Sequence, residues 1–362
     1  MNNGTERGQS YLDQQAEQLR GRHNPAGVPT RGANGTAGAL ASTTLEKAAA
    51  SRLAPVCVSL GELLAKNIPP RAPMLSPWLT EQSLSMIYAW RGIGKSWLGL
   101  SVAYAVASGC DVLGWHAPSK RRVLYLDGEL PARVMQSRLA LIVGTFDGEP
   151  DPDGFRILTP DLQPNGVMPN LSDYAGQAAI DEYADQADLI IIDNLSTLAR
   201  GGKENEGESW LPVQEWALRH RAKGRAVLFI HHAGKGGQQR GASRREDVLD
   251  TVISLRRSAD YNPADGAKFE LHFEKARNLT GDEAQPLDVR LHGDDNGIRW
   301  EYAPAEDGIL DRLEALSKEG ASRAEILDEL GLSRFALTRL VEKANEAGRN
   351  IKLPDSRKRG KA

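Results

Sequence analysis

Short runs of apolar residues alternate along this chain with longer segments in which apolar residues recur every three or four positions. Runs of this kind, bounded by glycine or charged residues, are typical of strands that a sheet buries on both faces. The longer segments have the periodicity of helices. The pattern therefore predicts an α/β fold with a mostly parallel sheet. The predicted strands are 84–88, 122–126, 155–158, 188–193, 226–230, 248–255 and 268–273, with helices at 97–108, 132–143, 174–185 and 210–220 and a closing hairpin of 287–291 and 298–302.

The two ends of the chain differ from its middle. The first segment has little apolar periodicity and many Gly, Asn, Gln, Thr and Ala residues, so we expect it to be largely disordered. A short helix and Pro-rich extended chain follow, which we interpret as a strap leading into the main domain and possibly onto a neighbouring subunit. The predicted organisation is a disordered segment at 1–50, a strap at 51–80, the α/β domain at 81–303, a small helical module at 304–353 and a basic tail at 354–362.

Composition narrows the class of protein. The chain has 362 residues, of which 40% are hydrophobic and 26% charged, as in soluble globular proteins. No stretch approaches about 18 apolar residues, and no apolar signal core begins the chain, so we expect a cytoplasmic protein. Cys57 and Cys110 have no metal-binding or redox spacing. The net charge is −3, so any nucleic-acid binding would have to come from local basic patches.

The segment 84–101 reads as strand, glycine-rich loop and helix, which is the context that a phosphate-binding P-loop requires. Backbone N–H groups of such a loop surround phosphate, while Lys95 would reach the β- and γ-phosphates and the Ser96 hydroxyl would ligate Mg²⁺. Ala89 stands where the pattern usually has its first glycine. We therefore predict that the loop binds ATP with Mg²⁺. The predicted binding residues are Ala89, Trp90, Arg91, Gly92, Ile93, Gly94, Lys95, Ser96 and Trp97.

Polar residues follow three further predicted strands, where open α/β sheets place their ligands. Glu129 comes just after strand 122–126, which we expect to lie next to the P-loop strand. It is either the residue that orients or deprotonates the attacking water, or an acidic turn residue before a helix. Asp193 ends a buried strand and matches the second Mg²⁺ ligand of P-loop NTPases. His231 and His232 end another strand; of these, we predict that His232 senses the γ-phosphate, with His231 behind it.

Basic residues in two later stretches are candidates for other roles. The glycine-rich segment 234–245 would follow a phosphate backbone or be a solvated surface loop, and its candidate DNA contacts are Lys235, Arg240 and Arg244. Further on, Lys275 and Arg277 lie at a strand tip, where alternation of side chains would put both cations on one face. Neither has an evident partner in the sequence.

The C-terminal module contains three amphipathic segments, 307–317, 322–329 and 334–347. Two short helices around a Gly331 turn, after a leading helix, describe a helix-turn-helix of the winged-helix kind. Such modules bind DNA or contact proteins. For DNA, the contacting residues would be Ser333, Arg334 and Thr338, at the start of the recognition helix.

The motifs Ala-Trp-Arg-Gly-Ile-Gly-Lys-Ser, Leu-Asp-Gly-Glu, Leu-Ile-Ile-Ile-Asp, Phe-Ile-His-His-Ala-Gly-Lys-Gly and Lys-Ala-Arg-Asn-Leu-Thr-Gly, in this order, resemble those of RecA-like P-loop ATPases of the AAA family. They are most similar to the hexameric helicases of the plasmid RepA and DnaB type. The likeness covers about residues 53–303. It implies that Glu129 is the catalytic glutamate, Asp193 the second acidic motif and His231 or His232 the γ-phosphate sensor.

The same resemblance implies a ring, expected to have six subunits, in which Lys275 and Arg277 enter a neighbour's site. The loops near 201–208 and 234–245 would face single-stranded DNA in the channel. We therefore expect an ATP-hydrolysing DNA motor, such as a replicative helicase of a plasmid, phage or integrated element. Two alternatives stay open. One is a DNA-dependent ATPase regulator or loader that does not move along DNA, and the other is a binding module in which nucleotide only switches assembly on or off.

Overall fold

A computed structural model describes residues 56–201, 206–233, 247–257, 261–262, 266–277, 279–294, 297–346, 348–349 and 351–353. The disordered segment expected at 1–50, the basic tail at 354–362 and the candidate DNA contacts Lys235, Arg240 and Arg244 lie outside these residues. The chain divides into two units, Tyr11–Pro70 and a second that contains Arg71–Ala362. Within the described residues, no helix is long and apolar enough to cross a membrane.

The described part of the first unit contains one short helix, α3 (Leu60–Ala65). Its N-terminus has a complete capping box, in which the Ser59 hydroxyl accepts the Glu62 N–H and the Glu62 carboxylate accepts the Ser59 N–H. The start of the helix is thus fixed by local residues, Ser59 and Glu62. All six of its residues are exposed, and Leu60 and Leu64 keep 73% and 76% of their surface.

The second unit is built on a mixed sheet whose described strands run in the order β11-β10-β9-β8-β3-β7-β6-β4-β5. The strands from β8 to β5 in this order pair in parallel, and β9, β10 and β11 extend one edge in antiparallel fashion. This is the predicted α/β fold with a mostly parallel sheet. The bounds are β3 Leu84–Ala89, β4 Val123–Asp127, β5 Phe155–Leu158, β6 Leu189–Asp193, β7 Ala226–His232, β8 Thr251–Arg256, β9 Lys268–Ala276, β10 Leu287–Asp294 and β11 Gly297–Pro304.

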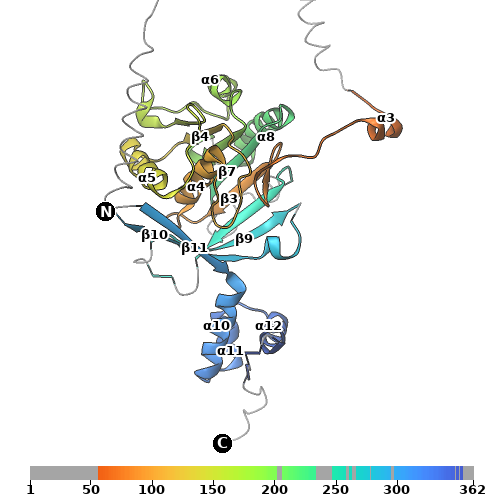
Figure 1. Cartoon of the computed structure of the whole chain (residues 1–362), viewed down its shortest axis with the longest axis vertical. Coiled ribbons are helices and arrows are strands. Elements are labelled where there is room, and N and C mark those ends of the chain that lie inside the picture. The colour runs from red at the N-terminus through yellow and green to blue at the C-terminus, as the bar shows by residue number, and fades with distance from the viewer. Residues whose placement is uncertain are drawn as a thin grey trace, which may run out of the picture. The chain divides into compact units, whose positions relative to one another are not determined.

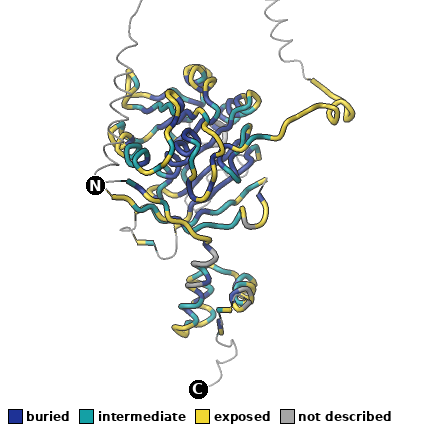
Figure 2. Tube along the Cα trace, viewed as in Figure 1, coloured by how far each residue is buried: buried dark blue, intermediate teal, exposed yellow. Residues whose placement is uncertain are grey.

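Helices cover both faces of this sheet (Figure 1). Alternate residues of one strand enter different cores: Leu189 and Ile191 pack in the core of α4 and α5, whereas Ile190 and Ile192 pack in that of α6 and α8. Three of the parallel strands, β3, β4 and β6, are accordingly buried along their whole length (Figure 2), whereas the edge strand β5 is only partly buried. The helices are α4 Lys95–Ser108, α5 Ala132–Thr145, α6 Tyr174–Ala184, α7 Leu195–Leu198 and α8 Glu206–Ala222, with 3₁₀ turns η1 Pro160–Leu162 and η3 Gly281–Ala284 and a small ribbon of β1 Pro73–Leu75 and β2 Leu79–Thr80.

Two expectations about the strands are wrong. The strand predicted from residue 248 begins only at Thr251, because Asp250 bonds instead to Leu84. The Asp250 carboxylate accepts the Leu84 N–H at 3.0 Å, and the Asp250 N–H donates to the Leu84 carbonyl at 2.7 Å. The strand that precedes Glu129 does not adjoin the P-loop strand, because β7 and β6 lie between β4 and β3. Both errors concern how distant segments pair, which local pattern does not determine.

The C-terminal module has three helices around its own core, α10 (Ala305–Lys318), α11 (Arg323–Glu329) and α12 (Arg334–Glu346). Ser322 caps α11 in a capping box with Glu325, and the Ser333 hydroxyl accepts the Ala336 N–H at the start of α12. The helices are those predicted. No strand follows α12 in the described residues up to 353, so the wing of the expected winged-helix fold is absent from that part.

Candidate nucleotide-binding site

The P-loop joins β3 to α4 by a turn whose glycines are required. Gly92 and Gly94 have φ values of 76° and 122°, which side-chain-bearing residues rarely adopt. A Cβ on Gly94 would also lie 2.7 Å from the Cβ of Ala267. Ala89, in contrast, is the buried last residue of β3 and is not among the residues with positive φ. Alanine therefore fits the position of the usual first glycine without backbone strain.

Lys95 begins α4 and is buried, with 6% of its surface exposed. Its Nζ donates hydrogen bonds to the carbonyl oxygens of Ala89, at 3.0 Å, and Trp90, at 2.7 Å. Burial lowers the pKa of Lys95 to about 8, although the carboxylates of Asp193 and Glu129 oppose this shift. The ammonium group is therefore held within the P-loop, where a phosphate would find a charged donor.

Asp193 ends β6 and is buried beside the P-loop helix. Its Oδ2 accepts the Tyr125 hydroxyl at 2.7 Å, and its carboxylate is also hydrogen-bonded to Ser96. Burial raises the pKa of Asp193, while the bonds from Tyr125 and Ser96 and the charge of Lys95 act against that rise. The structure thus brings together the two predicted Mg²⁺ ligands, one hydroxyl and one carboxylate. Mg²⁺ takes few protein ligands and completes its shell with water and phosphate oxygens, so this pair fits the ion.

Asp127 was not singled out from the sequence, yet it shapes the turn that presents Glu129. The carboxylate of Asp127 accepts the Thr159 hydroxyl at 3.0 Å and the Leu130 N–H at 3.1 Å, and burial raises its pKa to about 6. Gly128 lies so close to α7 that a Cβ would collide with it. The turn is therefore fixed by contacts on both sides, and Glu129 projects from it.

Glu129, Asn194 and His232 form one hydrogen-bonded group. The Nε2 atom of His232 lies 3.3 Å from Oε1 of Glu129 and 3.1 Å from Nδ2 of Asn194. Burial would raise the pKa of Glu129, but bonds from Asn194 and His232 and the charge of Lys95 outweigh it, so the pKa is lowered. Burial and the charge of Lys95 lower the pKa of His232, although the hydrogen bond and the negative charge of Glu129 act to raise it. Near neutral pH the group therefore holds an ionised carboxylate next to a neutral imidazole.

The two histidines of β7 are placed differently, as alternation along a strand requires. His232 faces the site, whereas His231 is buried on the other side of β7, 3.4 Å from the Ser196 hydroxyl. Among the described residues, no three His, Cys, Asp or Glu side chains are grouped to hold a metal ion. His232 thus lies beside Glu129 and Asn194, and its contact with the γ-phosphate stays a prediction.

A cavity of about 990 Å³ joins these groups at the carboxyl edge of the parallel strands. Sequence reasoning missed several of its residues. Arg138 of α5 enters it with its guanidinium 4.8 Å from the centre of the Trp97 ring, a cation–π distance. No motif marks Arg138, since only the packing of α5 directs it inward. The lining comprises Arg91, Gly92, Gly94, Lys95, Ser96, Trp97, Glu129, Leu130, Arg138, Leu141, Asp193, Asn194, His232, Tyr261, Gly266, Ala267, Leu291, Gly293, Asp294 and Ile298.

Lys275 and Arg277 lie away from this cavity. β9 runs antiparallel to β8, and Lys275 pairs with Val252 near the start of β8. This is the amino end of the parallel strands, whereas the P-loop follows the carboxyl end of β3. Arg277 donates to the Asp247 carbonyl at 2.9 Å and lies 4.0 Å from the Asp250 carboxylate. The expectation that Arg277 has no partner in its own chain is therefore wrong. Its position still leaves it unable to serve its own P-loop.

A family model described as an AAA domain matches residues 48–238, more than half of the chain. Among solved structures, a KaiC-like protein from Pyrococcus horikoshii OT3 is 15% identical, with a TM-score of 0.43, over 63% of this chain and 93% of its own. The flagellar accessory protein FlaH from Methanocaldococcus jannaschii is 15% identical, with a TM-score of 0.40, over 62% of this chain and 91% of its own. The family match agrees with the P-loop and the sheet described above: the chain belongs to the AAA domain family.

Proposed function

We propose that this protein hydrolyses ATP to drive a DNA-associated motor, as a replicative helicase of the RepA type. The observation that supports hydrolysis is the single cavity in which Lys95, Asp193 and Glu129 meet. A buried ammonium, a carboxylate paired with a hydroxyl and a second, ionised carboxylate are the groups that phosphoryl transfer to water requires.

In this proposal the P-loop N–H groups and Lys95 bind the β- and γ-phosphates. Ser96 and Asp193 would hold Mg²⁺, which when bound would neutralise charge on the phosphate oxygens. Glu129 orients the attacking water and accepts its proton, and its lowered pKa keeps it ionised for this task. Asn194 and His232 fix the Glu129 carboxylate, and His232 is placed to contact the γ-phosphate. Tyr125 orients Asp193 by its 2.7 Å hydrogen bond.

The proposed assembly is a homo-oligomeric ring, for which six subunits are expected by resemblance. Its support within this chain is α3, whose apolar side chains Leu60, Leu63 and Leu64 are all exposed. A capped helix with an exposed apolar surface is typical of a segment that a partner subunit covers. Single-stranded DNA would pass through the ring, as the motif order of such helicases implies.

The motor role is tested by three measurements on the full chain: ATP hydrolysis with and without single-stranded DNA, unwinding of a forked duplex, and particle mass by mass photometry. We expect DNA to stimulate hydrolysis and ATP to drive unwinding by an oligomer. Stimulated hydrolysis without unwinding would favour the alternative function, a DNA-dependent regulator or loader. Its observed support is the three-helix module, in which Arg334 and Thr338 are exposed at the start of α12.

Deletion of residues 305–362 should leave ATP hydrolysis within about twofold of the full chain and weaken duplex DNA binding by about tenfold or more. The module has its own hydrophobic core, separate from the two cores that hold the cavity, so its removal spares the site. Fluorescence anisotropy with a labelled duplex measures the binding. A narrower control replaces Arg334 with alanine. Undiminished duplex affinity in both variants would favour a protein-contact role for the module.

A further inference from the structure

The nucleotide cavity has an apolar part that the hydrolysis mechanism does not use. Trp97 of α4, Leu141 of α5 and Leu291 and Ile298 of the β10–β11 hairpin line the same cavity as the phosphate-binding groups. Leu141, Leu291 and Ile298 have no group that can donate a hydrogen bond to phosphate, and Trp97 offers only its indole N–H beside a large apolar ring system. An apolar wall inside a site for a highly charged ligand indicates that part of the ligand is itself apolar.

The hairpin wall is held rigidly against the helices that follow the P-loop and the Glu129 turn. The Ile298 N–H donates to the Thr145 hydroxyl on α5 at 2.8 Å, and the Trp300 indole N–H donates to the Ser101 hydroxyl on α4 at 3.0 Å. A Cβ on Gly297 would lie 2.5 Å from the same Thr145 hydroxyl. The wall is thus preformed rather than assembled around a ligand.

The wall also begins beside the phosphate loop. Leu291 donates its N–H to the Ala267 carbonyl at 2.8 Å, and Ala267 is the residue whose Cβ lies 2.7 Å from the position a Gly94 Cβ would take. A single residue, Ala267, therefore lies between the P-loop and the hairpin. A nucleotide whose phosphates lie on the P-loop would have its sugar and base within reach of the hairpin.

We propose that the nucleobase of the bound nucleotide lies against this wall, between α5 and the inner face of the β10–β11 hairpin. This inference rests on the proposed function. Leu141, Leu291 and Ile298 contact the faces of the planar base, and the Arg138–Trp97 pair borders it on the α4 side. Recognition by apolar contact rather than by hydrogen bonds makes the contact area of the base the source of affinity. The hairpin is then a binding element for nucleotide, besides being the edge of the sheet.

The test compares a ligand that has a base with one that lacks it. Affinities of the full chain for ATPγS and for inorganic tripolyphosphate, both with Mg²⁺, are measured by titration calorimetry. Leu291→Ala and Ile298→Ala should each weaken ATPγS binding by roughly tenfold, the usual value of a lost apolar group in a binding pocket. Binding of tripolyphosphate should stay within about twofold, because its groups bind only the P-loop.

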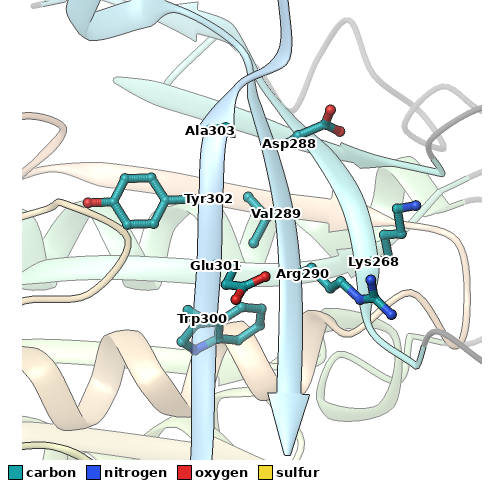
Figure 3. Close-up of a pocket in the computed structure, with 8 residues that line it drawn as sticks. All are labelled: Lys268, Asp288, Val289, Arg290, Trp300, Glu301, Tyr302 and Ala303. Carbon is teal, nitrogen blue, oxygen red and sulfur yellow. The ribbon is translucent and has the colours of Figure 1, made fainter. Parts of the chain in front are cut away.

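A matched control is Val289→Ala. Val289 is buried in the same hairpin but lines a different hollow, of about 660 Å³, over β9, β10 and β11, where Lys268 and Arg290 lie side by side (Figure 3). This variant should change neither affinity. Thermal unfolding reports whether each variant folds, and Ile298→Val, which removes a single methylene, replaces Ile298→Ala if that chain does not fold.

Equal losses for ATPγS and tripolyphosphate in the Leu291 and Ile298 variants would overturn the inference, because the hairpin would then only support the P-loop. Unchanged ATPγS affinity in both variants would overturn it as well. A wild-type chain that binds neither ligand would instead refute the proposed function, so the two failures are distinguishable.

Discussion

Glu129→Gln should lower ATP turnover by about 10²–10⁴-fold, the usual contribution of a general base. Glutamine keeps the size of the side chain and can still bond to Asn194 and His232, but its amide cannot accept the proton of water. Binding of ATPγS should therefore remain close to that of the wild type. Single-turnover phosphate release, together with a binding titration, separates the two effects.

The control for this variant is Glu149→Gln, at an exposed carboxylate outside the cavity lining, which should change neither binding nor turnover. Near-normal turnover in Glu129→Gln would show that Glu129 is only an acidic turn residue before α5. The position of Glu129 in the group with Asn194 and His232 favours the catalytic role.

Arg277→Ala should reduce hydrolysis by about 10³–10⁵-fold while ATP binding is retained, if Arg277 completes the site of an adjacent subunit as the resemblance implies. This is the range measured for arginines that act in trans in GTPases. Arg277 is about half exposed and lies at the end of the sheet opposite its own P-loop, so any nucleotide that it contacts would belong to another chain. Phosphate release and ATPγS binding are measured on the same preparation.

The structure adds a control that separates this role from a structural one. Arg71 also pairs with Asp250, at 3.4 Å, so both arginines stabilise the same buried carboxylate. If loss of a partner for Asp250 caused the inactivity, Arg71→Ala would be inactive as well. We expect Arg71→Ala to stay active, because its partner Asp250 precedes β8, at the amino ends of the parallel strands, whereas the cavity lies at their carboxyl ends.

Mixing inactive chains tests the trans role itself. In rings formed from Arg277→Ala and Lys95→Ala, some interfaces combine an intact P-loop from one chain with an intact arginine from the other. Titration of the two variants at fixed total concentration should therefore restore part of the phosphate release. No release at any ratio, with mixed oligomers confirmed by native mass spectrometry, would contradict a role in trans.

Local sequence determined much of the fold and the polar half of the site. Apolar runs located β5 and β6 to within a residue, and the P-loop pattern located Lys95 and Ser96, since these signals depend on near neighbours. The order of the strands was not predictable, because pairing of β4 with β6 rather than β3 depends on contacts between distant segments. For the same reason sequence reasoning missed Arg138, which only the packing of α5 brings into the cavity.

Partners formed over long separations account for two further differences between prediction and structure. Asp250 was predicted to lie within a strand. It instead precedes β8 and bonds to Leu84, Arg71 and Arg277, which come from three distant parts of the sequence. The apolar wall of the cavity likewise comes from a hairpin far downstream of every nucleotide motif, and no spacing relates Ile298 to Lys95.

The most direct test of a nucleotide site at this P-loop is the rate of phosphate release from Mg·ATP by the Lys95→Ala chain. Hydrolysis should fall to background, because the substitution removes the one ammonium group held inside the loop. The fold should survive, since burial of this charge costs free energy in the native state, as the lowered pKa of Lys95 indicates. Lys120→Ala, at an exposed lysine paired with Asp151, should keep wild-type turnover. Turnover by folded Lys95→Ala equal to that of the wild type would contradict the account.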